Sequence, residues 1–257
     1  MGQAEPLPEY MDVKKMILVA HRGDQTNYPE NTLASIAGAI EAGAQAVEFD
    51  VQLTSDRVPV LFHDDSLRRM SGVSKSLFDC EYKDLENYRA SQPGRFGNRF
   101  QTTTIATLYE TVELLQAHPE VKVFLEVKGE SLARFGTGET LLKIFDAIEE
   151  IREQVMIISF EANALTVARQ MEGYPIGWVI RHYNEKTRVA AEKLQPELLC
   201  CSLEKIPRQA KNLWSGNWQW MLETTSDPKM INKYAELGID YLETDDISAM
   251  LAAVKNN

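Results

Sequence analysis

The chain has 257 residues, 44% of them hydrophobic and 25% charged, which is enough for one large α/β domain or two small ones. Its formal net charge of −11 argues against nucleic acid and anionic membrane surfaces as partners. A small anionic substrate fits only where a metal ion and a few cations reverse the field locally. No apolar run approaches the length that crosses a bilayer, which excludes a stable membrane anchor of that kind.

The start of the chain and the cysteines bear on the compartment. Residues 1–15 are polar and lack the basic start and apolar stretch of a secretory signal. The three cysteines, Cys80, Cys200 and Cys201, have no metal-ligand spacing, and we expect reduced thiols. Both observations predict a cytoplasmic location. The sequence leaves the oligomeric state open, a dimer included.

Apolar, β-branched runs alternate with amphipathic stretches along most of the chain, which predicts a parallel α/β fold. The predicted strands are Ile17–Ala20, Val47–Val51, Val58–His63, Val121–Lys128, Met156–Phe160, Gly177–Ile180, Leu198–Ser202, Met221–Thr224 and Tyr241–Glu243. The predicted helices are Thr32–Ala42, Leu108–Ala117, Glu139–Arg152, Glu161–Met171, Lys186–Leu194, Pro207–Trp214 and Pro228–Leu237.

Nine strands are one more than an eight-stranded barrel accepts, and the surplus strand can be located. Residues 52–57 are too few for a parallel crossover, so the strands on either side of them must form an antiparallel hairpin. A turn symmetric about Ser55 and Asp56 places His63 opposite Glu48, to within about two residues of register. The other eight strands fit a (β/α)₈ TIM barrel with a β-hairpin after its second strand.

The segment Asp65–Gln101 does not follow the alternation of strands and helices. Long inserts in compact domains are usually lids or binding loops, and this one follows His63 directly. We therefore expect an inserted loop or small subdomain at about residues 65–101 that lies over the barrel mouth. The whole chain, residues 1–257, is then a single TIM-barrel domain.

Two strands carry carboxylates that share a face. Alternate strand residues point the same way, so Glu48 and Asp50 lie together, and so do Glu126 and Lys128. Buried carboxylates are costly unless they are paired or bind a metal, and their oxygens suit Mg²⁺ or Ca²⁺. Glu126 is the candidate third ligand and Lys128 a candidate phosphate contact. Structural ion pairs, including one between Glu126 and Lys128, are the alternative.

Histidine and arginine residues stand where barrel chemistry is expected. His21-Arg22-Gly23 follows the first predicted strand, and catalytic groups of barrels collect at the carboxyl ends of strands. Read alone, this triplet is more often a structural histidine at the rim beside a surface arginine.

Together these motifs resemble the glycerophosphodiester phosphodiesterase family. The matching blocks are His21-Arg22-Gly23, Pro29-Glu30-Asn31-Thr32-Leu33, Glu41-Ala42-Gly43-Ala44, Glu48-Phe49-Asp50-Val51-Gln52-Leu53-Thr54 and Val58-Pro59-Val60-Leu61-Phe62-His63-Asp64-Asp65. Weaker similarity continues through Leu125–Lys128 and Ile158–Phe160 to Thr244-Asp245. The resemblance spans most of the chain, and its most specific part is residues 17–69.

The resemblance implies a (β/α)₈ barrel with an insert and a role for each motif residue. Glu48, Asp50 and Glu126 fall on the family's metal-ligand positions, for one divalent ion, Mg²⁺ or Ca²⁺, with Mn²⁺ also acceptable. His21 and His63 fall on its acid/base pair, Arg22 and Lys128 on its phosphate contacts, and Glu30 on a supporting position. The implied reaction is hydrolysis of glycerophosphodiesters to glycerol 3-phosphate and an alcohol. Glu223 stands where the family often has a tryptophan, which leaves the alcohol group open.

Three alternatives are weighed against this hypothesis. A lysophospholipase D-type enzyme would cleave the head groups of lysolipids by the same chemistry. A catalytically silent barrel would act as a binding module. A metal-dependent sugar isomerase would account for the carboxylates, but not for the two histidines.

Overall fold

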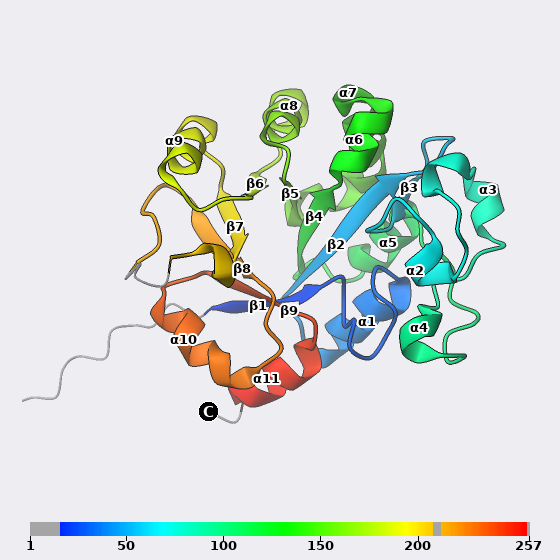
Figure 1. Ribbon diagram of the computed structural model, residues 1–257, viewed down its shortest axis with the longest axis horizontal. Helices are drawn as coiled ribbons and strands as arrows, with labels where there is room; N and C mark the ends of the chain where they lie inside the picture. The colour runs from blue at the N-terminus through cyan, green and yellow to red at the C-terminus, as the bar shows by residue number, and fades with distance from the viewer. Residues whose placement is uncertain (1–15, 208–211, 256–257) are drawn as a thin grey trace, which may run out of the picture.

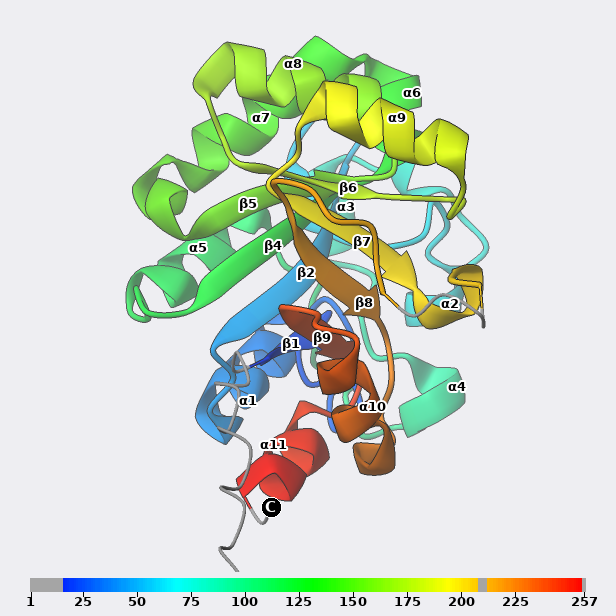
Figure 2. The same cartoon turned by 90° about the vertical axis from the view of Figure 1, so that its left-hand side faces the viewer.

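The computed structural model describes residues 16–207 and 212–255. Nine strands form one sheet in the order β1-β9-β8-β7-β6-β5-β4-β2-β3, and β1 also pairs with β2. All of these pairs are parallel except β2 with β3, so the β1–β2 pairing closes eight parallel strands into a barrel. Figure 2 shows this ring of strands with helices packed around its outside. The predicted (β/α)₈ TIM barrel is confirmed.

The strands are β1 (Ile17–His21), β2 (Ala46–Leu53), β3 (Pro59–Leu61), β4 (Lys122–Val127), β5 (Val155–Ser159), β6 (Ile176–Val179), β7 (Leu198–Ser202), β8 (Gln219–Glu223) and β9 (Tyr241–Thr244). The helices are α1 (Leu33–Ala42), α2 (Arg68–Ser71), α3 (Tyr82–Leu85), α4 (Pro93–Phe96), α5 (Leu108–Gln116), α6 (Gly129–Phe135), α7 (Thr137–Ile148), α8 (Ala162–Glu172), α9 (Glu185–Leu194), α10 (Ile231–Glu236) and α11 (Ile247–Lys255). Short 3₁₀ turns are η1 (Leu77–Asp79), η2 (Glu149–Gln154), η3 (Leu203–Lys205) and η4 (Pro228–Met230). None of the described helices is both long and apolar enough to cross a bilayer.

Local sequence signals fix the loop that leads from β1 into α1. Thr32 caps α1 in a reciprocal capping box with Ser35, which satisfies free backbone N–H groups at the start of the helix. The helix ends at Gly43, whose φ of 98° is the left-handed conformation typical of a C-terminal cap. The β1–α1 loop is therefore held at the barrel rim, where its polar residues face the mouth.

The predicted hairpin is present, with a register one step from the predicted one. Val51 pairs with Leu61 and Leu53 with Pro59, which centres the turn on Asp56. Arg57 takes a left-handed φ of 63°, and its N–H donates to the Thr54 carbonyl within this turn. The shift lies within the predicted tolerance. His63 follows soon after β3 and reaches the barrel mouth.

Outside the insert, three helical segments differ from prediction. α6 and α11 were not expected, because α6 is short and polar and α11 begins among acidic residues. The predicted helix Pro207–Trp214 is wrong at its ends, since Pro207 and residues 212–214 are not helical. Residues 208–211 of that prediction lie outside the described residues.

The insert, residues 65–101, folds around its own apolar core. Leu67, Met70, Leu77 and Leu85 pack together against Phe62, in a cluster separate from the barrel core. Figure 1 shows the insert's helices α2, α3 and α4 together on one side of the barrel. The ring centroids of Phe100 and Tyr28 lie 6.0 Å apart, which ties the insert to the β1–α1 loop.

Candidate active site

A cavity of about 250 Å³ opens at the carboxyl ends of the barrel strands. Six of the residues singled out from the sequence line it: His21, Arg22, Glu48, His63, Glu126 and Lys128. No insert residue is among the described residues that line this cavity. Arg69 of the insert reaches the rim, where it contacts Asp64 beside His63, and a lid over the mouth stays a prediction.

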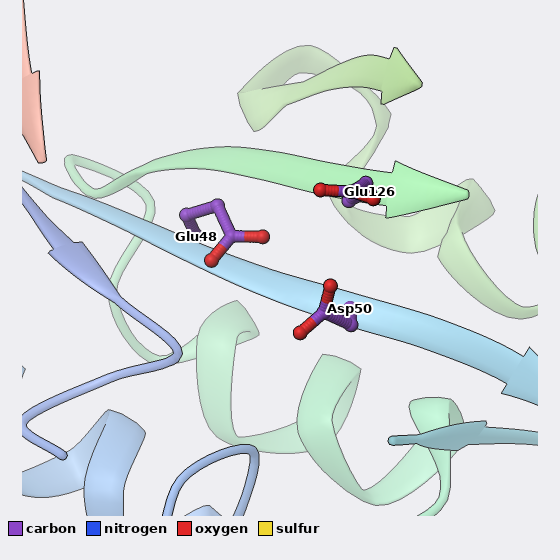
Figure 3. A group of neighbouring side chains, drawn as sticks. All are labelled: Glu48, Asp50 and Glu126. Carbon is purple, nitrogen blue, oxygen red and sulfur yellow. The ribbon is translucent and has the colours of Figure 1, made fainter. Parts of the chain in front are cut away.

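Three carboxylates meet at one side of the cavity, and two of them, Glu48 and Glu126, line it. Asp50 on β2 lies beside Glu126 on β4 in the strand register, and Glu48 precedes Asp50 on the same face. Each offers an oxygen within 4.8 Å of the others. Figure 3 shows the carboxyl groups of Glu48 and Asp50 near that of Glu126, across two neighbouring strands. The strand parity expected from the sequence therefore brings the predicted metal ligands together.

The three carboxylates differ in pKa because the cations act most strongly on one of them. Burial and the negative charge of Asp50 raise the pKa of Glu48 well above its usual range. The same causes raise the pKa of Glu126 from 4.5 to about 7. Burial alone would raise the pKa of Asp50, but the charges of Arg22 and Lys128 hold it below its usual range. The cluster thus contains more acid than its cations can neutralise.

The residues present fit a divalent metal ion. Oxygen Oδ1 of Asp50 is buried and accepts no hydrogen bond, although Nζ of Lys128 lies 3.2 Å away. Carboxylate oxygens are the ligands that Mg²⁺ and Ca²⁺ prefer. The alternative of internal ion pairing is also present in part, since Nζ of Lys128 lies 2.8 Å from Oε1 of Glu126. One lysine and one arginine cannot neutralise three carboxylates, and that imbalance suits a bound cation.

His21 is oriented by a carboxylate from the far end of the chain. Its Nδ1 lies 2.8 Å from Oδ1 of Asp245, to which Nε2 of Gln25 also donates. A carboxylate only accepts, so Nδ1 carries the proton of the neutral ring and Nε2 is left as the acceptor. That Nε2 lies 4.0 Å from Oε2 of Glu48, on the side of the carboxylates.

His63 has the same arrangement with its neighbour in sequence. Its Nδ1 lies 2.7 Å from Oδ1 of Asp64. Arg69 of the insert donates to both oxygens of Asp64, from Nε and Nη2, each at 2.9 Å. Two histidines with a carboxylate on Nδ1 therefore line one cavity. Sequence reasoning did not assign roles to Asp64 or Asp245, although both stand in the quoted motifs.

Arg22 binds the carboxylates through both its side chain and its backbone. Its Nη1 donates to Oε1 of Glu30 at 2.8 Å, and its Nε lies 3.1 Å from Oδ2 of Asp50. A left-handed φ of 57° turns its backbone N–H toward Oε2 of Glu48, at 3.1 Å. Glu30, 3% exposed, also pairs with Arg69 at 2.5 Å. The supporting position expected for Glu30 is thus a buried link between two arginines.

Gly23 and Asn31 shape the same loop. Gly23 has a φ of 79°, and a Cβ there would come within 2.6 Å of the Ser35 carbonyl oxygen, so no other residue fits. Asn31 donates to Oδ2 of Asp50 at 2.8 Å and accepts from the Asp50 backbone N–H at 3.1 Å. Asn31 was missed as a site residue, and its place in the Pro29–Leu33 block was its only signal.

The opposite side of the cavity carries two further acids. Glu223 at the end of β8 and Glu243 on β9 both line it, and Glu243 is 4% exposed. Burial and the charge of Glu223 raise the pKa of Glu243 well above its usual range. Between them and β4, the wall is mostly apolar, with Ile158, Val179 and Met221 among its residues.

Comparison with known proteins supports one family. Residues 21–249 match the Glycerophosphoryl diester phosphodiesterase family. A glycerophosphodiester phosphodiesterase of Caldanaerobacter subterraneus is 29% identical over 249 residues, which cover 94% of this chain and 98% of that protein. Glycerophosphodiester phosphodiesterase 1 of Mus musculus is 32% identical over 154 residues, which cover 60% of this chain and 45% of the mouse protein.

The fold comparison agrees. A solved structure of an Oleispira antarctica phosphodiesterase, in complex with the product sn-glycerol-3-phosphate, has a TM-score of 0.81. It is 25% identical, with 93% of this chain and 96% of that chain covered. The chain therefore belongs to the glycerophosphoryl diester phosphodiesterase family and is a phosphodiester hydrolase.

Proposed function

We propose that this chain hydrolyses glycerophosphodiesters to glycerol 3-phosphate and an alcohol with the help of one divalent metal ion. The observation that carries the proposal is the pair of histidines, each held at Nδ1 by an aspartate, beside three converging carboxylates. The product named for the Oleispira antarctica relative, sn-glycerol-3-phosphate, supports the same substrate class here.

Glu48, Asp50 and Glu126 would hold the ion, with Mg²⁺, Ca²⁺ and Mn²⁺ as the candidates. When bound, the ion supplies positive charge that stabilises the negative charge of the phosphate in the transition state. Arg22 and Lys128 add their own charges at the cavity wall, where they can contact the phosphate oxygens.

The histidines would move the protons. Since Asp245 and Asp64 occupy Nδ1, each ring offers Nε2 to the substrate. One of the two takes a proton from the nucleophile, and the other protonates the leaving alcohol. The nucleophile is either water or the 2-hydroxyl of the glycerol arm, which would give a cyclic phosphate first. Phosphorus NMR of the reaction separates these routes, because only the second passes through a cyclic diester.

The test is release of glycerol 3-phosphate from a panel of glycerophosphodiesters, with each metal added back to chelated protein. We expect His21→Ala and His63→Ala each to lower kcat by about a hundredfold or more. His182→Ala is the matched control, because His182 is exposed and lies outside the cavity. A His21→Ala protein that retains most of its activity would falsify the assignment.

The same substrate panel tests the alternative functions. Lysophosphatidylcholine tests the lysolipid alternative, to which the apolar wall of Ile158, Val179 and Met221 gives some support. Failure to cleave any diester with any of the three metals would favour a silent binding module. Three free, buried cysteines in the described part of the chain support the proposed cytoplasmic location.

A further inference from the structure

Two carboxyl groups on strands β8 and β9 lie at the cavity and have no role in the proposed reaction. Glu223 is the last residue of β8, and Glu243 lies on the neighbouring strand β9. Both line the cavity, and Glu243 is 4% exposed, so the small exposed part of its side chain faces the cavity. Neither belongs to the group of carboxylates that could share a metal ion.

No cation of the described residues pairs with these two acids. The positive charge of Arg22 partly offsets the raised pKa of Glu243, but the Arg22 side chain is bound to Glu30 and Asp50. On the opposite wall, Lys128 is bound to Asp50 and Glu126. A buried carboxylate without a partner is costly, so a cation in the substrate space would stabilise the ionised form of Glu243.

The cations nearest the apolar wall have partners of their own. Arg181 donates to Oε1 of Glu161 at 2.9 Å, and Nζ of Lys205 donates to the Ile180 carbonyl at 3.2 Å. No described cationic side chain pairs with Glu223 or Glu243, so a cationic group of the substrate can pair with them.

The lining favours one kind of cation. Quaternary ammonium groups are bound by cages of aromatic rings, but Phe160 is the one phenyl ring among the described lining residues. Its face holds the Arg181 guanidinium, 4.7 Å from the ring centroid. A primary ammonium group has three N–H donors and can bond two carboxylates at once.

We infer that Glu223 and Glu243 form a subsite for a primary ammonium group on the alcohol half of the diester. The inference rests on the proposed function and names its preferred substrates, the phosphodiesters whose alcohol half carries a primary ammonium group. The tryptophan that the family often has at position 223 would offer an aromatic face there, so the glutamate exchanges an apolar contact for a charged one.

The experiment compares three diesters that share the glycerol 3-phosphate half. Glycerophosphoethanolamine carries a primary ammonium, glycerophosphocholine a quaternary one, and glycerophosphoglycerol none. We expect the highest kcat/KM for the first. Glu223→Gln should lower that value about tenfold or more, because a charge-assisted hydrogen bond is lost. The same substitution should change kcat/KM for glycerophosphoglycerol by less than about twofold.

Glu243→Gln should act in the same direction, and Glu204→Gln is the control on an exposed glutamate of the β7–β8 connection. An equal loss for all three diesters would overturn the subsite, because the acids would then serve the shared glycerol half. Equal wild-type rates for the three diesters would overturn it while leaving the proposed function intact. Cleavage of none of them would overturn both.

A second inference comes from the insert. Arg69 on α2 donates to both oxygens of Asp64, which holds His63, and to both oxygens of Glu30, which holds Arg22. We propose that Arg69 is a positioning residue that fixes the orientation of His63 through Asp64. It too rests on the proposed function, since His63 is the group that Arg69 acts through.

Its test is a double-mutant cycle. Arg69→Met should lower kcat about tenfold to a hundredfold, whereas Arg68→Met, on an exposed neighbour in α2, should leave kcat nearly unchanged. In a His63→Ala background, Arg69→Met should cost much less kcat than in the wild type, because the route through Asp64 is gone and only the link through Glu30 to Arg22 remains. A full further loss in that background, or equal effects of the two arginine variants, would overturn the proposal.

Discussion

Replacing Glu126 by glutamine is expected to stabilise the metal-free protein at pH 8. The pKa of Glu126 in the folded chain is about 7, above its ordinary 4.5, because the carboxyl is buried near Asp50. The folded chain therefore holds more protons than the unfolded chain between these two values. This group's contribution to stability is complete below about pH 4.5 and is lost as the pH rises through 7.

The magnitude follows from the two pKa values. A tenfold change in proton affinity corresponds to 1.36 kcal/mol, so ionising Glu126 in the folded chain costs about 3 kcal/mol. Glutamine has no charge to bury and keeps an oxygen that can accept from Nζ of Lys128, now 2.8 Å from Oε1. The weaker bond to Lys128 offsets about 1 kcal/mol. We expect a net gain of about 1–3 kcal/mol at pH 8 and almost none at pH 5.

Urea unfolding in the presence of a chelator, at pH 5 and pH 8, measures this difference. Glu130→Gln is the matched control, because Glu130 is exposed and starts the neighbouring helix α6. If Glu126→Gln is no more stable than the wild type at pH 8, or gains as much at pH 5, the reasoning about this buried carboxyl is refuted.

Three further predictions follow from the site. Adding Ca²⁺ or Mg²⁺ to chelated protein should raise Tm and release protons, because Glu126 ionises when the metal ion binds. Released protons are taken up by the buffer, so the calorimetric heat of binding should depend on the buffer used. A heat that is the same in every buffer would contradict this prediction. Asp245→Asn should lower kcat about a hundredfold or more, because His21 loses the acceptor that fixes the orientation of its ring. The circular dichroism spectrum should stay unchanged, and a near-normal kcat would count against this role of Asp245. Cys200 and Cys201 are buried, and burial raises the pKa of Cys201 to about 12. A thiol reagent should therefore modify these two cysteines only after unfolding. Rapid modification of the native protein would refute their burial.

Local patterns predicted much of the fold and part of the site. The side-chain alternation of strands placed Glu48 and Asp50 on one face, and the short connection after Val51 required a hairpin. Side-chain alternation and the minimum length of a parallel crossover both depend only on residues close in sequence. The two predictions therefore stay correct when the strand register is wrong by one residue. The same rules located the surplus strand and hence the eight-stranded barrel.

Contacts that depend on barrel closure could not be predicted in this way. Asp245 meets His21 across 224 positions of sequence, and no local pattern connects them. Glu243 stands inside an apolar strand, and its orientation into the cavity depends on the tilt of β9 in the closed barrel. Arg69 lies in an insert without clear periodicity, so its bridge between Glu30 and Asp64 was not visible either.

The pairing of β1 with β9 also has a consequence for the order of synthesis. His21 is made 224 residues before Asp245, which directly follows β9, and β1 is flanked by β9 on one side and β2 on the other. A nascent chain that already contains the three carboxylates and both histidines still lacks the group that orients His21. On the proposed mechanism, a nascent chain therefore has little activity until β9 has paired with β1.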